Sequence, residues 1–126
     1  MSTDRVRDGR RIAQLLASEL ESGASHDALA VTDADPDVEP TAEGALAYRV
    51  LDSRSEGTVA TVFVQPDRTR VEFETAPAAV ADAAEEAGLR VRPKASEPPR
   101  AVVFVEDGAE AKHVLPAFEA ALAEES

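Results

Sequence analysis

Apolar residues recur along this chain with two spacings, one typical of helices and one typical of strands. Residues 4–21 place apolar side chains at every third or fourth position, which predicts an amphipathic helix. A second helix is expected to follow Thr75 as its N-cap and to end before Gly88. The last helix should open at a capping box over residues 107–110, and Pro116 should kink it or mark where it restarts.

The strands are marked by alternating apolar and polar residues with turns between them. Six stretches are expected to be strands: residues 28–33, 45–52, 58–65, 69–74, 89–93 and 101–105. Of these, 58–65 and 101–105 carry apolar residues on both faces, which for 101–105 indicates a central strand. The second, third and fourth are joined by short turns, so we expect them to form an antiparallel meander. In two of these strands the side chains expected to face inward are Leu46, Tyr48, Val50, Val71 and Phe73, and those expected to face outward are Arg70, Glu72 and Glu74.

Together these elements predict the fold class. The order is α-β-β-β-β-α-β-β-α, which indicates an α+β fold with a mostly antiparallel sheet of about six strands and three helices. The length of 126 residues suits a single domain over residues 1–126.

The composition predicts a small core. Leu, Ile, Val and Phe together number 28 of the 126 residues, just above the share at which a highly charged chain stays disordered. Such a core gains stability when a second copy buries more apolar surface. The strand over residues 58–65 supports this expectation because it carries apolar residues on both faces. We therefore expect a homo-oligomer.

Several classes of chemistry lack their usual residues. The chain has no cysteine, which excludes disulfides and thiol nucleophiles, and no two of its six glycines are close enough to form a phosphate-binding loop. The acidic loop over residues 33–40 lacks the glycine and the final glutamate of a calcium loop. His26 and His113 lack zinc-site spacing, and the adjacent Ser25, His26 and Asp27 cannot all point to one site. We expect no metal and no cofactor, and nothing here favours an enzyme.

The charge of the chain is strongly negative. It has 25 acidic and 13 basic residues, giving a formal net charge of −12, and only two of the bases are lysine. This composition is similar to that of proteins from halophiles that accumulate salt, and the opening segment over residues 4–16, DRVRDGRRIAQLL, resembles a family of small uncharacterised proteins of halophilic archaea. The resemblance implies a habitat and no function. No stretch is apolar enough to cross a membrane, so a cytoplasmic protein is expected.

Two basic islands interrupt this acidity, at residues 5–11 and 90–100. If they converge, they could bind a phosphate, an acidic segment or a nucleic-acid backbone. The candidate anion-binding residues are Arg7, Arg11, Arg90, Arg92, Lys94 and Arg100. The competing interpretation, which we favour, is that the strand bases pair with the nearby acids Glu72, Glu74 and Glu106. All five aromatic residues are expected in the core, which argues against base stacking and hence against nucleic acid.

Two functional hypotheses remain. The first is a non-enzymatic interaction module that self-associates. The alternative is a binder of a small anionic ligand or nucleic acid through the two basic islands.

Overall fold

The computed structural model describes residues 8–22, 28–35, 37–95 and 99–125. Its six strands form one antiparallel sheet in the order β1-β2-β3-β4-β6-β5. The strands are β1 (Leu29–Thr32), β2 (Ala45–Asp52), β3 (Thr58–Gln65), β4 (Arg68–Phe73), β5 (Arg90–Lys94) and β6 (Arg100–Val105), and the helices are α1 (Gly9–Ser22), α2 (Pro77–Glu86), α3 (Glu110–His113) and α4 (Leu115–Glu125). The predicted α+β class, the order of elements and the meander of β2, β3 and β4 are confirmed.

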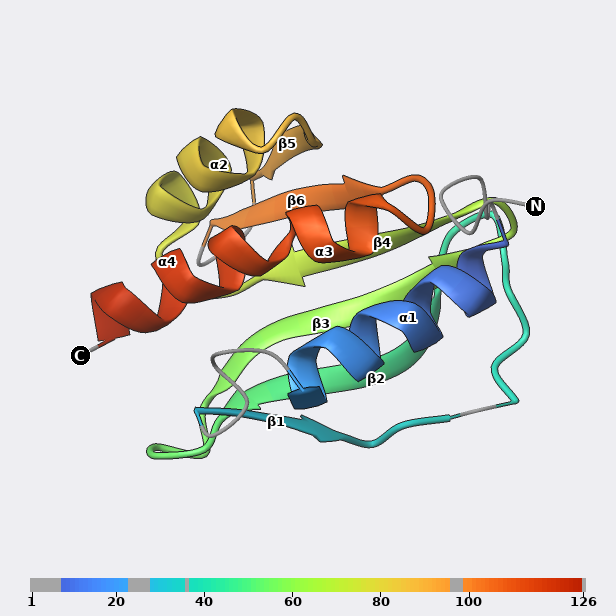
Figure 1. Ribbon diagram of the computed structural model, residues 1–126, viewed down its shortest axis with the longest axis horizontal. Helices are drawn as coiled ribbons and strands as arrows, with labels where there is room; N and C mark the ends of the chain where they lie inside the picture. The colour runs from blue at the N-terminus through green and yellow to red at the C-terminus, as the bar shows by residue number, and fades with distance from the viewer. Residues whose placement is uncertain (1–7, 23–27, 36, 96–98, 126) are drawn as a thin grey trace.

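The helices all lie on one face of the sheet (Figure 1). Helix α1 packs on β1, β3 and β4, whereas α2 packs on β5, β6 and α4. The core lies between these two layers. Val62, Val71 and Val103 stand side by side across three strands, and each is fully buried. Phe73 meets Phe118 of α4 edge to face, with ring centroids 4.7 Å apart.

The first helix begins later than its apolar spacing predicts. Helix α1 begins at Gly9, because the Asp8 carboxylate accepts hydrogen bonds from the backbone N–H groups of Arg10 and Arg11 and so acts as the N-cap. Gly9 itself packs against the β3–β4 turn, where a Cβ atom would collide with the Gln65 carbonyl oxygen. Arg7 lies outside the described residues.

Helix α1 is also tied to the sheet by a buried tyrosine. The Tyr48 hydroxyl donates a hydrogen bond of 2.8 Å to the carbonyl oxygen of Ala13. Burial raises the pKa of Tyr48, and the nearby Glu21 raises it further, so the hydroxyl keeps its proton. The contact fixes one side of the helix over β2.

One predicted core residue faces the other way. Leu46 was expected to point inward, but it is the exposed large apolar side chain of the described residues, at 37% exposure, and Ala47 is buried instead. The cause is a shift in register between β2 and β3: Leu46 pairs with Phe63, and Tyr48 pairs with the next residue, Val62. The extra residue breaks the alternation of faces at this point.

The later helices differ from prediction in their ends. Thr75 is not the N-cap of α2, because the helix begins at Pro77 and the N-cap position falls on Ala76, in the left-handed conformation with φ 47°. The end before Gly88 is confirmed, with this glycine at φ 85°. The last predicted helix divides into α3 and α4 next to Pro116, which confirms the expected restart.

Candidate binding face of the sheet

The basic residues of the strands all lie on the face of the sheet that carries no helix. Within the six strands there are seven basic residues and only two acidic residues, Asp52 and Glu72. Strand alternation and register place every one of the seven on the helix-free side: Arg49, Arg68, Arg70, Arg90, Arg92, Lys94 and Arg100. We call these seven residues and their surroundings the basic face. Its bases come from β2, β4, β5 and β6, so only the folded sheet brings them together.

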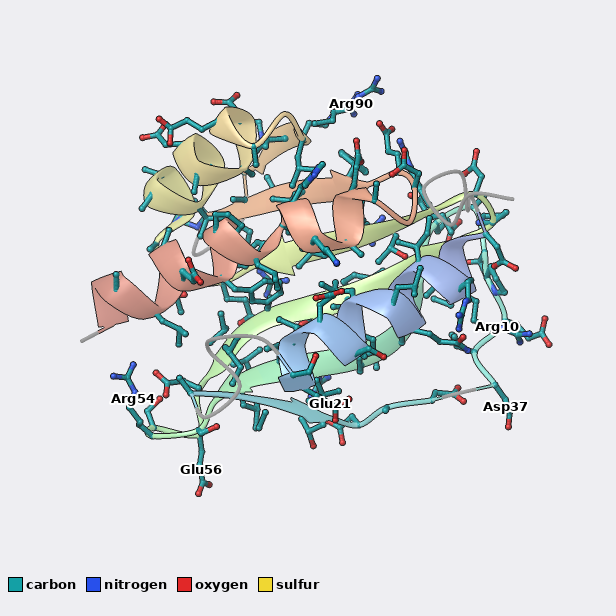
Figure 2. The ribbon with its side chains drawn as sticks, viewed as in Figure 1. Arg10, Glu21, Asp37, Arg54, Glu56 and Arg90 are labelled. Carbon is teal, nitrogen blue, oxygen red and sulfur yellow. The ribbon has the colours of Figure 1, made fainter. Side chains whose placement is uncertain are left out.

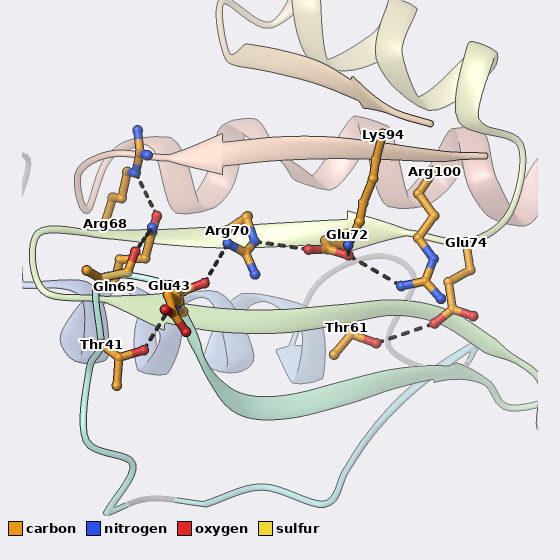
Figure 3. A network of polar contacts seen from close by, with 12 residues as sticks. Thr41, Glu43, Thr61, Gln65, Arg68, Arg70, Glu72, Glu74, Lys94 and Arg100 are labelled. Atoms are coloured by element: carbon orange, nitrogen blue, oxygen red, sulfur yellow. Dashed lines mark hydrogen bonds and ion pairs between the residues drawn. The ribbon is translucent and has the colours of Figure 1, made fainter. Parts of the chain in front are cut away.

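A buried carboxylate stands at the centre of this face. Glu72 is 3% exposed although it lies on the side without helices. Arg70 Nε lies 3.1 Å, Lys94 Nζ 3.1 Å and Arg100 NH1 3.3 Å from its oxygens. Figure 3 shows the three cations converging on Glu72 from β4, β5 and β6. The long basic side chains, and not a helix, bury this residue. Strand alternation places Glu72 on the outer side of the sheet and does not by itself predict this burial.

The cluster has more positive than negative charge. Three cations surround one carboxylate, so a formal charge of +2 remains. Arg70 donates a further hydrogen bond to the Glu43 carbonyl oxygen. The Nε group of Arg100 is buried, and no described residue accepts a hydrogen bond from it. A buried N–H donor without an acceptor is unfavourable and is satisfied when an acceptor binds beside it.

Two phenylalanine rings lie on the basic face, which corrects the expectation that all aromatic residues fill the core. The Arg68 guanidinium lies 4.3 Å from the centroid of Phe104, and that of Arg70 lies 4.6 Å from the centroid of Phe63. These distances are typical of cation–π stacking. The guanidinium groups cover the rings, so the rings are not open for a nucleic-acid base to stack on them.

The predicted pairing of strand bases with acids is confirmed for two of the three acids. Glu72 takes Lys94 and Arg100, as described above. Glu106 forms ion pairs with Arg90, at 3.9 Å, and with Arg68, at 3.6 Å. Glu74 instead accepts a hydrogen bond of 3.4 Å from Thr61.

The two basic islands remain apart in the described structure. Arg11 lies on α1, on the opposite side of the sheet from the basic face, and donates to Gln14. Arg10 and Arg90 project from different sides of the molecule (Figure 2). Arg92 is exposed, and among the described residues it makes no ion pair. Anion binding by the residues of the second island remains a prediction.

One protein family matches the chain over its whole length. Residues 1–126 match DUF7993, a family of unknown function. The chain belongs to the DUF7993 family. No curated protein and no solved structure matches it.

In the part of the chain that the structure describes, no group of three or more acidic or histidine side chains could hold a metal ion, and no helix is long and apolar enough to cross a membrane. The sequence reasoning missed Arg68 and Arg70 as members of the site, and it named Glu72 only as an acid with which the strand bases could pair. The alternation of β4 could have indicated these residues, because each lies on the opposite side of the strand from the core residues Val71 and Phe73.

Glu106, Asp107 and Glu110 form hydrogen bonds within the turn before α3. The Glu110 N–H donates to the Asp107 carboxylate, as the predicted capping box requires, but the Glu110 carboxylate accepts from the N–H of Glu106 and not from that of Asp107. Helix α3 begins at Glu110 with Ala109 as its N-cap, so the predicted capping box does not open the helix. Burial raises the pKa of Glu110, and the neighbouring charges of Asp107 and Glu106 raise it further. These contacts order the turn before α3.

Proposed function

We propose that this DUF7993 protein is a non-enzymatic binding module that docks an acidic protein surface on its basic face. The observation that carries the proposal is the separation of charge. A chain with a net charge of −12 places seven of its thirteen bases on one face of the sheet. Complementary charge speeds encounter between partners and sets their orientation.

The state of these bases supports binding rather than simple shielding of the sheet. Glu72 neutralises one of the three cations that touch it, and the Nε of Arg100 has no acceptor among the described residues. Arg68 and Arg70 are held flat by stacking on phenylalanine rings. Arginine in this arrangement is weakly hydrated and already ordered, which suits burial in an interface.

A protein partner fits this face better than nucleic acid. Single-stranded nucleic acid is bound by aromatic rings on which bases stack. Phe104 is buried under Arg68, and Phe63 lies under Arg70. A carboxylate-bearing surface needs no open ring, because contact with guanidinium and ammonium groups is sufficient.

We further propose, from the acidic and lysine-poor composition, that the protein works in a salt-rich cytoplasm. At about 1 M salt the Debye length is about 3 Å, so charges interact only in close contact. Binding on the basic face would then depend on contact ion pairs and on apolar packing, and less on long-range attraction.

The test is titration calorimetry of the whole protein with poly-glutamate and, separately, with single-stranded oligothymidylate, at low salt and at about 1 M potassium chloride. Poly-glutamate should bind, and the double variant Arg92→Glu/Lys94→Glu should lower its affinity roughly tenfold. Arg11→Glu is the matched control, because Arg11 lies on the other side of the sheet, and it should leave binding unchanged. Binding of oligothymidylate alone, or equal losses in both variants, would overturn the proposal.

Self-association is a second candidate, favoured by a separate observation. Leu46 is exposed beside Phe63 on the same face. Among the described side chains of α2 and α4, four acids are exposed, so a second copy offers an acidic surface of its own: Asp82, Glu85, Glu86 and Glu119. Light scattering across a range of concentrations should show a dimer that Leu46→Glu weakens. A monomer at every concentration would refute this candidate and leave a different acidic partner.

A further inference from the structure

Strand β5 forms an exposed edge of the sheet. Among the described strands it stands last in the order and pairs with β6 alone, and four of its five residues are exposed. An edge strand leaves backbone N–H and C=O groups on its outer side without partners in the sheet. Such an edge is the place where an extended peptide can add as a further strand.

An apolar groove runs along the same strand. It has a volume of about 560 Å³ and lies between α2 and β5. Ala78 and Ala81 line it from the helix, and Val91 and Pro93 line it from the strand. Val91 pairs with the core residue Val103, so its side chain lies on the helix-bearing side of the sheet.

The two sides of β5 therefore differ sharply in chemistry. Val91 and Pro93 face the apolar groove, whereas Arg90, Arg92 and Lys94 belong to the basic face, and Arg92 and Lys94 also contribute to the lining of the groove. Side chains of a β-strand alternate between the two sides of the sheet. A strand added beside β5 would consequently place every second residue against the groove and the others against three bases.

We propose that β5 binds an extended peptide of the partner in which apolar and acidic residues alternate. This inference rests on the proposed function, because the acidic residues of the peptide contact the basic face. It adds that the partner binds as an extended strand. Its apolar residues enter the groove beside α2, and its acidic residues pair with Arg90, Arg92 and Lys94.

Pro93 makes this edge selective. Proline has no N–H to donate, and it is tolerated in edge strands where its nitrogen faces away from the sheet. An added strand therefore gains fewer backbone hydrogen bonds than usual, and its side chains decide whether it binds. Basic strands are rejected by three like charges, and the proline and charges also protect the edge from indiscriminate pairing.

The test measures fluorescence polarisation of a labelled short peptide of alternating valine and glutamate, added to the whole protein. This peptide should bind more tightly than poly-glutamate of the same length, because only it has side chains for the groove. Ala78→Phe fills the groove from an exposed position and should lower the affinity for the peptide roughly tenfold. Ala123→Phe, an exposed alanine on α4 outside the groove, is the matched control and should have no effect. Circular dichroism verifies that both variants fold.

The outcomes separate this inference from the function on which it rests. If Ala78→Phe leaves peptide binding unchanged, or if poly-glutamate binds as tightly as the alternating peptide, strand addition is wrong. In either case, sensitivity of poly-glutamate binding to Arg92→Glu would still support docking on the basic face. If neither probe binds, both proposals fail. A valine–lysine peptide that binds equally well would also contradict the inference.

Discussion

Replacing Glu72 by glutamine tests whether the buried carboxylate holds the basic face together. The substitution keeps the shape of the side chain and removes its charge. Arg70, Lys94 and Arg100, each within 3.3 Å of the carboxylate, would then face one another without a counter-ion. We expect the folded state to lose stability while the rest of the core stays intact.

The size of the loss follows from the exposure of the three cations. Removing one partner of a buried ion pair costs about 3–5 kcal/mol. Here Lys94 is 48%, Arg100 31% and Arg70 19% exposed, so water screens part of the repulsion and the lower end, about 3 kcal/mol, applies. With an unfolding entropy of about 2.1 cal/mol/K per residue, that loss lowers Tm by about 10 °C in a chain of 126 residues.

A thermal melt followed by circular dichroism measures this loss. Glu74→Gln is the matched control, because Glu74 accepts one long hydrogen bond from Thr61 and should shift Tm by only a few degrees. Added salt should recover part of the loss in Glu72→Gln by screening the three cations. Equal melting shifts in the two variants, or no response to salt, would refute this reasoning.

Three further outcomes are expected elsewhere in the fold. Gly9→Ala should cost about 3 kcal/mol in urea unfolding with an unchanged m-value, because the new methyl group collides with backbone of the β3–β4 turn. Tyr48→Phe should cost about 1–2 kcal/mol in the same assay, since it leaves the Ala13 carbonyl without its donor. Hydrogen bonds from Arg54 lower the pKa of Asp52, so this carboxylate stabilises the fold above its unfolded pKa of about 4 and loses that effect as the pH falls further. Asp52→Asn should therefore reduce the acid-induced loss of stability in a pH series.

The parts of the structure that local spacing determines were predictable. Strand boundaries, the meander and the side of β5 that carries Arg90 and Arg92 all follow from alternation within one strand. The pairing of Arg100 with Glu72 also follows, because bases on one strand pair with acids on a neighbouring strand.

Other features depend on pairing between distant segments, and local spacing could not supply them. The exposure of Leu46 arises from a shift in register against β3, which no pattern inside β2 reveals. Burial of Glu72 requires β6 to insert between β4 and β5, so that bases from three strands converge. The arginine stacks on Phe63 and Phe104 have the same origin, since each ring lies beneath a base from a neighbouring strand.

The cost of burying Glu72 is itself an argument about function. A sheet face that only needed shielding from water could carry threonine or other neutral polar side chains, which avoid desolvating a charge. This face instead buries a carboxylate at its centre and surrounds it with three cations. The carboxylate holds the long basic side chains in fixed positions and neutralises only one of the three positive charges. An ordered surface with remaining positive charge loses less entropy when an acidic partner binds, and we consider that preorganisation the reason for the arrangement.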